Sequence, residues 1–133
     1  SDVMELAESI IQQLEAGEAG IHIWGAEATV NLPGNPGRGG RNQHLALLLA
    51  EHIQQRSDLQ ILVAATDGDD GVTEDAGAIV DGQTIQRGEQ EGMDVMQCIT
   101  RADAGSFLES SGDLVYTGPT GTNVMDLLIV CKT

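Results

Sequence analysis

The chain has 133 residues, and its 21 acidic and 6 basic side chains give a formal net charge of −15. This length fits one domain, and a hydrophobic content of 41% is too high for a disordered acidic tail. The negative charge argues against nucleic acid and anionic membranes as partners, because both bind to basic protein surfaces.

The sequence contains no segment typical of membrane insertion or secretion. No apolar run approaches the roughly 20 residues of a membrane-spanning helix, and the N-terminus lacks the basic and apolar regions of a signal peptide. Cys98 and Cys131 lack the spacing of a metal or redox site and are expected to be reduced thiols. We therefore predict a cytoplasmic protein.

The N-terminal part of the chain is predicted to form a helix followed by two short strands. Apolar residues spaced four apart predict a helix over residues 2–15, which Gly17 ends. β-Branched and aromatic residues predict strands over residues 21–24 and 29–32, joined around Gly25.

The next elements are predicted to be a buried helix and a buried strand. Asn42 is expected to cap a helix over residues 43–56, which is apolar on nearly all sides and so should lie between a sheet and another layer. The unbroken apolar run over residues 59–66 predicts a strand that is buried on both faces.

The second half of the chain predicts shorter elements. They are a strand over residues 78–80, helices over 83–90, 94–101 and 103–109, and strands over 114–116 and 126–131. Helices interleaved with apolar strands indicate the α/β fold class, with a layered mixed β-sheet flanked by helices in a single domain. The sheet is expected to be mixed because two of its short strands are adjacent in sequence near the N-terminus.

The three histidines are interpreted as structural residues. His44 and His52 lie eight positions apart in the predicted helix, which is too far to share a metal ion. His22 alternates with Ile21 and Ile23, and we expect it on the solvent side of its strand.

Three polar, glycine-containing loops lie beside predicted strands, at residues 33–42, 67–77 and 117–125. In α/β folds, ligands bind where strands end and such loops begin. The first loop offers backbone N–H groups, Arg38, Arg41 and a helix N-terminus, which together suit an anion. A flexible hairpin tip with a solvated arginine explains the same residues, and both interpretations stay open.

The second and third loops differ in the ligands they offer. The second carries Asp67 and Asp70, whose carboxylates are candidate Mg²⁺ ligands, although a turn capped by its own side chains is the alternative. Asp67 ends an apolar strand, where desolvation favours a functional role. The third loop supplies neutral hydrogen-bonding groups and, taken alone, fits an ordinary turn.

Four motifs, in this order, resemble one family. They are Gly-Gly-Arg-Asn-Gln at 39–43, Thr-Asp-Gly-Asp-Asp-Gly at 66–71, Asp-Ala-Gly-Ala at 75–78 and Thr-Gly-Pro-Thr-Gly-Thr-Asn at 117–123. The family is MOFRL, the C-terminal domain of two-domain glycerate 2-kinases, some of which carry the name hydroxypyruvate reductase. The resemblance runs from about Trp24 to residue 133, and residues 1–20 are expected to form an N-terminal helix and connection.

The resemblance implies ATP-dependent phosphorylation of D-glycerate to 2-phosphoglycerate, with Mg²⁺. The active site would lie in a cleft between this domain and a larger N-terminal kinase domain, which is absent from this chain together with the lysine that it is understood to contribute. We therefore expect the isolated domain to be inactive and to bind neither ATP nor Mg²⁺ stably.

The resemblance also implies site residues. Glu27, Arg41 and Asp67 match family positions in the active site, where the arginine would stabilise anionic charge and the acids would bind metal or substrate. The substrate-binding candidates in the same motifs are Asn42, Thr120 and Asn123. The family usually has two glycines before its first acid, whereas this chain has Gly-Ala at 25–26.

Two other functions remain open from the sequence. The domain could be a stand-alone binding module for a small phosphorylated or carboxylated metabolite. An NAD(P)H-linked reductase would agree with the older family name, but the chain lacks a dinucleotide-binding fingerprint.

Overall fold

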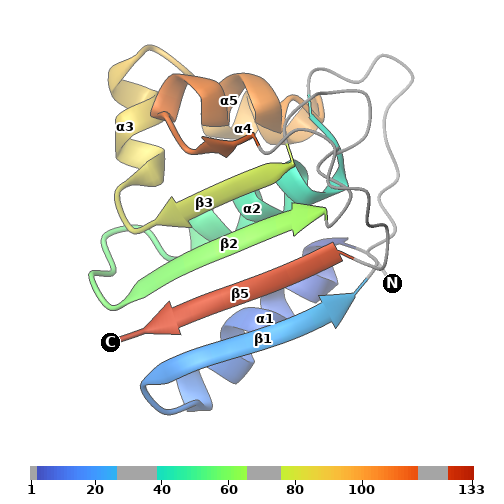
Figure 1. The fold of residues 1–133 in the computed structure, drawn as a ribbon. Helices are drawn as coiled ribbons and strands as arrows, with labels where there is room; N and C mark the ends of the chain where they lie inside the picture. The colour runs from blue at the N-terminus through green and yellow to red at the C-terminus, as the bar shows by residue number, and fades with distance from the viewer. Residues whose placement is uncertain (1–2, 27–38, 66–75, 117–125) are drawn as a thin grey trace.

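The computed structural model describes residues 3–26, 39–65, 76–116 and 126–133. The described elements, in chain order, are α1 (Val3–Ala16), β1 (Gly20–Ala26), α2 (Arg41–His52), β2 (Leu59–Ala65), β3 (Gly77–Asp81), α3 (Thr84–Gln90), α4 (Val95–Thr100), α5 (Ala104–Ser111), β4 (Leu114–Val115) and β5 (Asp126–Lys132). The strands form one five-stranded sheet in the order β1-β5-β2-β3-β4 (Figure 1).

The core lies between one face of this sheet and the helices. Helices α1 and α2 lie behind the sheet in Figure 1, and α3, α4 and α5 gather beside β3 and β4. The largest fully buried apolar side chains include Leu14, Leu47, Leu49, Ile61 and Phe107. Each such side chain stabilises the fold by about 1.5–3 kcal/mol through burial. The predicted layered α/β fold is confirmed.

All strand pairings in the described part of the sheet are antiparallel, where the sequence analysis expected a mixed sheet. Strands β1 and β2 run in the same direction, but β5 lies between them and runs opposite to both. Because β5 lies between β1 and β2, these two strands are not parallel neighbours. Each of them pairs with β5 in the antiparallel direction instead.

Helix α2 begins earlier and ends earlier than predicted. Its N-cap is Gly40, which has an extended backbone and no side-chain cap, so the predicted N-cap Asn42 lies inside the helix. At the other end, Gln55 adopts a left-handed φ of 67° and donates its N–H to Gly82 O at 2.7 Å. This turn stops the helix before Arg56.

Strand β2 is buried on one face, whereas the sequence predicted burial on both. Leu59, Ile61, Val63 and Ala65 are buried, but Gln60 between them is exposed. The alternation arises because the described helices cover only one side of the sheet.

The prediction that His22 lies on the solvent side of β1 is wrong, because the described helices cover only one side of the sheet and His22 is on that side. Its Nε2 lies 2.8 Å from Glu18 O, and its ring stacks on Trp24 with 6.1 Å between the ring centroids. Ile21 and Ile23 instead are 71% and 65% exposed. Strand β1 also continues through Gly25, and the predicted strand at 29–32 lies outside the described residues.

The remaining predicted elements are confirmed within one to three residues. Asp94 caps α4, because its Oδ1 accepts the Gln97 N–H at 3.1 Å. Gly112 ends α5 with a left-handed φ of 83°. Within the described ranges, no helix has the length and apolar character needed to cross a membrane.

Gly88 in α3 provides a test of this packing. A Cβ at this position would lie 2.3 Å from Cζ of Phe107, whose ring is fully buried. Gly88→Ala should therefore destabilise the fold by about 1–3 kcal/mol through overpacking, although Ala in a helix interior normally stabilises by about 1 kcal/mol relative to Gly.

Chemical denaturation followed by circular dichroism measures this change in the free energy of unfolding. Gln86→Ala, at an exposed position of the same helix, is the control and should change it by less than about 0.5 kcal/mol. A Gly88→Ala protein that is more stable than the parent would show that the α3–α5 packing is wrong.

Candidate functional site

Two of the three loops singled out from the sequence, at 67–77 and 117–125, are joined to strand ends that meet at one edge of the sheet. Asp126, the first residue of β5, pairs with Ala26 at the end of β1 and with Ala65 at the end of β2. Next to them, Ala64 pairs with Gly77 at the start of β3. The described strand ends on either side of the second and third loops therefore meet at this edge, which lies on the right in Figure 1.

An ion pair joins α2 to the sheet at this edge. Arg41 Nε donates to Asp126 Oδ2 at 2.6 Å, although the two residues are 85 positions apart. The Asp126 side chain is 9% exposed and the Arg41 side chain is 41% exposed. Short hydrogen bonds between ionised groups are about twice as strong as neutral ones, so Asp126 holds a partly exposed guanidinium at the sheet edge.

The start of α2 adds a second feature that suits an anion. Gly39 has a φ of +115°, and a Cβ there would lie 2.8 Å from the backbone N of Gly105 in α5. Only glycine satisfies both the backbone angle and the space. Gly40, the N-cap, makes no side-chain cap hydrogen bond, and the positive end of the helix dipole at this position favours an anion.

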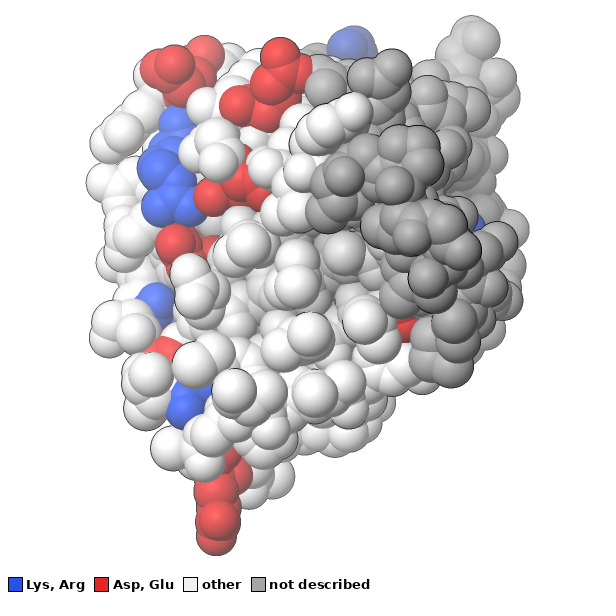
Figure 2. All heavy atoms as spheres, viewed as in Figure 1, with Lys and Arg blue, Asp and Glu red and all other residues white. Residues whose placement is uncertain are grey.

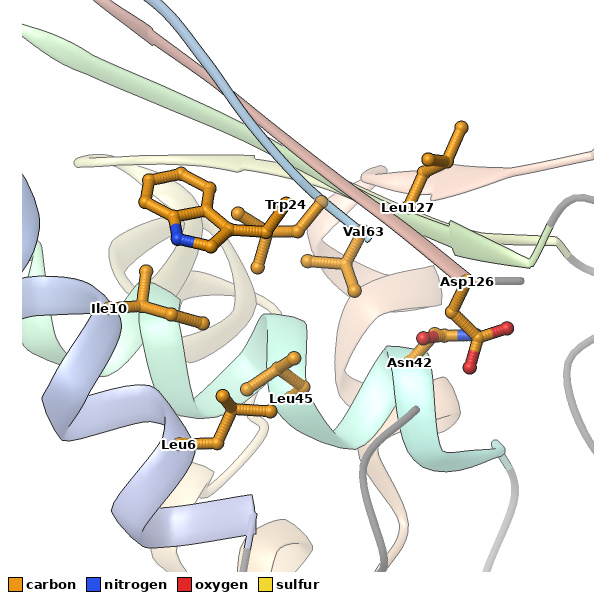
Figure 3. A pocket seen from close by; sticks show the side chains of 9 residues that line it. Leu6, Ile10, Trp24, Asn42, Leu45, Val63, Asp126 and Leu127 are labelled. Atoms are coloured by element: carbon orange, nitrogen blue, oxygen red, sulfur yellow. The ribbon is translucent and has the colours of Figure 1, made fainter. Parts of the chain in front are cut away.

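A small pocket lies beside the ion pair. Its volume is about 40 Å³, and the side chains that line it come from α1, α2 and three strands. Figure 3 shows Asn42 and Asp126 at one end and apolar side chains such as Leu6, Ile10 and Trp24 along the rest. This volume holds a few water molecules at most, so the pocket supports the site without holding a metabolite.

Buried His44 lies in the first turn of α2, close in sequence to Arg41. Its Nδ1 has no hydrogen-bond partner in the described structure, and burial lowers the pKa of its ring. The ring is therefore neutral at pH 7, as a structural histidine in an apolar setting would be.

The structure describes two of the site residues predicted from the sequence, Arg41 and Asn42, and brings both next to Asp126. The others, namely Glu27, Asp67, Asp70, Thr120 and Asn123, lie outside the described residues. No group of three or more His, Cys, Asp or Glu side chains in the described ranges could hold a metal ion. Asp67 and Asp70 stay the predicted metal ligands.

Asp126 is the site residue that the sequence analysis did not identify. Its signal in the sequence is an acidic side chain at the start of an apolar strand, directly after a glycine-rich loop. That signal alone does not reveal the arginine that pairs with it, because the pairing depends on where β5 enters the sheet.

An arginine held by a buried aspartate at a helix N-terminus, on the loop-bearing edge of an α/β sheet, defines a domain suited to anionic ligands. The model of the MOFRL family matches residues 20–126, and the chain belongs to this family. The resemblance seen in the sequence is confirmed.

Two relatives and a solved structure illustrate the similarity of this chain to glycerate kinases. It is 42% identical over 115 residues to glycerate 2-kinase of Pyrococcus horikoshii, a match that covers 85% of this chain and 26% of that protein. It is 46% identical over 107 residues to D-glycerate 2-kinase of Thermotoga maritima, with 80% and 25% covered. The crystal structure of glycerate kinase from Thermotoga maritima superposes with a TM-score of 0.92 at 36% identity, covering 100% of this chain and 34% of that one.

The chain thus spans about a quarter of the length of these curated relatives. It corresponds to one domain of a longer protein type.

The burial of His44 predicts how stability depends on pH. Because burial holds the pKa of His44 in the folded state below the ordinary histidine value of about 6.5, the unfolded chain takes up a proton there more readily than the folded chain. The free energy of unfolding is then fully retained above about pH 6.5 and falls as the pH decreases below it, with a limiting slope of about 1.4 kcal/mol per pH unit for one proton.

Urea denaturation between pH 7.5 and 5.5 measures this dependence. His44→Gln should flatten the decrease, whereas His52→Gln, at an exposed position of α2, should leave it unchanged. Equal pH profiles for the parent and His44→Gln would contradict the buried neutral histidine.

Proposed function

We propose that this domain contributes active-site residues to ATP-dependent phosphorylation of D-glycerate to 2-phosphoglycerate, and that it needs an N-terminal kinase domain to do so. The observation that carries this proposal is Arg41, held by buried Asp126 at the loop-bearing edge of the sheet. Membership of the MOFRL family and similarity to glycerate 2-kinases support it. We also propose a cytoplasmic location and a small-molecule substrate.

Phosphoryl transfer depends on positioning and on neutralising charge more than on covalent catalysis. In this proposal, Arg41 stabilises negative charge on a phosphate or on the glycerate carboxylate. Asp67 takes the proton of the glycerate hydroxyl or binds Mg²⁺, and Glu27 orients the substrate or the metal. Asp126 acts through Arg41 as a positioning residue.

The short stretches of chain between the strand ends and the two acids support the proposal that Glu27 and Asp67 lie near Asp126. Glu27 directly follows Ala26, and Asp67 comes two residues after Ala65, both of which pair with Asp126. Since each residue extends the chain by at most about 3.6 Å, both acids stay within about 7 Å of the strand ends. Asn42, Thr120 and Asn123 would supply neutral hydrogen bonds to the substrate.

The described residues fit the anionic part of a nucleotide or substrate better than they fit a metal ion. Arg41, the glycines before it and the N-terminus of α2 suit a phosphate, whereas the nearest described carboxylate, that of Asp126, is paired with Arg41. Mg²⁺ would neutralise phosphate charge during transfer, and Asp67 and Asp70 are the residues proposed to bind it. ATP binding would require the N-terminal domain.

A mutant cycle in the two-domain protein tests the roles of Arg41 and Asp126. Arg41→Ala should lower kcat by roughly 10²–10³-fold, because a charge-stabilising contact is lost. Asp126→Asn should lower it by roughly 10–100-fold, the value of a hydrogen bond to a charged group. If Asp126 acts only through Arg41, the double variant should be no worse than Arg41→Ala alone.

The assay couples 2-phosphoglycerate formation from ATP and D-glycerate to a spectroscopic signal, and thermal unfolding checks that each variant folds. Arg101→Ala, which removes an exposed arginine at the end of α4, is the control and should retain full activity. Full activity in Arg41→Ala would overturn the proposed function. Additive effects of the two substitutions would overturn the positioning role of Asp126.

A second candidate function is binding of a small phosphorylated or carboxylated metabolite by this domain alone. It is favoured by the ion pair and the start of α2, which are in place within this chain. Calorimetric titration of the chain with 2-phosphoglycerate tests it. Micromolar binding that Arg41→Ala abolishes would support this function, and no heat of binding at millimolar ligand would exclude it.

A further inference from the structure

The chain contains one Phe, one Trp and one Tyr, and these three aromatic side chains lie in different surroundings. Phe107 is fully buried in the core. Trp24 lines the small pocket, where its Nε1 donates to Gln13 Oε1 at 3.2 Å. Tyr116 is instead 65% exposed. Of the three rings, that of Tyr116 is therefore the one whose face is available to a ligand.

Tyr116 lies at the edge of the sheet that carries the candidate site. It directly follows β4, whose Val115 O accepts the Ala76 N–H at 2.7 Å. Ala76 O in turn accepts the Ala65 N–H at 2.9 Å, and Ala65 pairs with Asp126. These contacts lead from β4 through the ends of β3 and β2 to the start of β5 (Figure 1). Tyr116 and the ion pair of Asp126 therefore share one edge.

The separation of the two groups along this edge suits the two ends of a nucleotide. Three strand spacings of about 4.8 Å place Tyr116 roughly 14 Å from Asp126. A nucleoside triphosphate carries an aromatic base at one end and its terminal phosphate at the other, and it is long enough to reach between these positions. Its phosphates would meet Arg41, and its base would meet Tyr116.

The segment that carries Tyr116 is anchored although the ring is exposed. The carboxylate of Asp113 accepts from Arg87 Nη2 at 2.8 and 3.0 Å and from Ser111 Oγ at 2.7 Å, and Asp113 O accepts the Ile79 N–H at 2.9 Å. Figure 2 shows basic and acidic side chains side by side at the upper left, in the region of α3 and the end of β3. Because its backbone is already fixed, Tyr116 loses less conformational entropy on binding than a residue of a free segment would.

We propose that Tyr116 stacks on the adenine ring of the phosphoryl donor and extends the candidate site along the sheet edge from Arg41. This inference rests on the proposed function, because it takes ATP as the donor. It assigns recognition of the base to this domain, in addition to recognition of the anionic groups. Stacking of a base on an aromatic side chain strengthens binding by about 5–150-fold.

Calorimetric titration of the two-domain protein with ADP and with inorganic pyrophosphate tests the proposal without turnover. Tyr116→Ala should raise the Kd of ADP by about 5–150-fold, because the base loses its stacking partner. The same variant should leave the Kd of pyrophosphate unchanged, because pyrophosphate has no base. Tyr116→Phe keeps the ring and should bind ADP like the parent. Tyr116→Leu keeps an apolar side chain without an aromatic face and should resemble Tyr116→Ala.

Steady-state kinetics of the same variants give a second readout. In Tyr116→Ala, the KM for ATP should rise while the KM for D-glycerate stays the same. Met96→Ala is the matched control, because it removes a large apolar side chain that is 58% exposed on α4, and it should change neither KM. Thermal unfolding confirms that each variant is folded.

Three outcomes would overturn the role of Tyr116. They are a two-domain protein that does not bind ADP, ADP binding that Tyr116→Ala or Tyr116→Leu leaves intact, and an equal loss of ADP and pyrophosphate binding in Tyr116→Ala. The last result would indicate a structural role or a contact with the preceding domain. Phosphorylation of D-glycerate that depends on Arg41 would leave the proposed function standing in each case. A protein that binds ADP through Tyr116 but does not phosphorylate D-glycerate would contradict the proposed function alone.

Discussion

The candidate site depends on one charged contact between a helix and a strand that are far apart in sequence. Asp126 is nearly excluded from water, and a carboxylate in that setting needs a cation close by. Arg41 supplies it at 2.6 Å, and in doing so the start of α2 is fixed against the first residue of β5. Removing Arg41 would leave the nearly buried carboxylate of Asp126 without its cation, which lowers stability. The same contact therefore serves the fold and orients a functional cation.

The geometry around this contact follows from the place of β5. Because β5 separates β1 from β2, the ends of both strands and the start of β5 meet at one edge, and the polar loops are attached there. The backbones of Gly39 and Gly105 lie close together. This contact places α5 against Gly39, the residue just before the N-cap of α2. A domain with few basic residues can in this way present one arginine in a defined position.

The sequence was informative wherever a local pattern determines structure. The spacing of Ile10 and Leu14 was enough to predict α1, and the capping residues Asp94 and Gly112 marked real helix ends. The N-cap of α2 was misplaced because Gly40 caps without a side chain, so the visible polar residue Asn42 was chosen instead. Family motifs pointed to Arg41, but a pairing across 85 residues has no local signature, and Asp126 was missed. Alternation in β1 correctly separated His22 from Ile21 and Ile23, yet it could not say which side the helices cover.

The central place of β5 has a consequence for how the domain forms. The strand that contacts both β1 and β2 is the last element in chain order, so its partners are made well before it. Until β5 is in place, β1 has no neighbour among the described strands and β2 has only β3. The apolar side of α1 then packs on an incomplete sheet. Such long-range pairing slows folding. The sheet of this domain therefore closes in a late step, after the other described strands have been made.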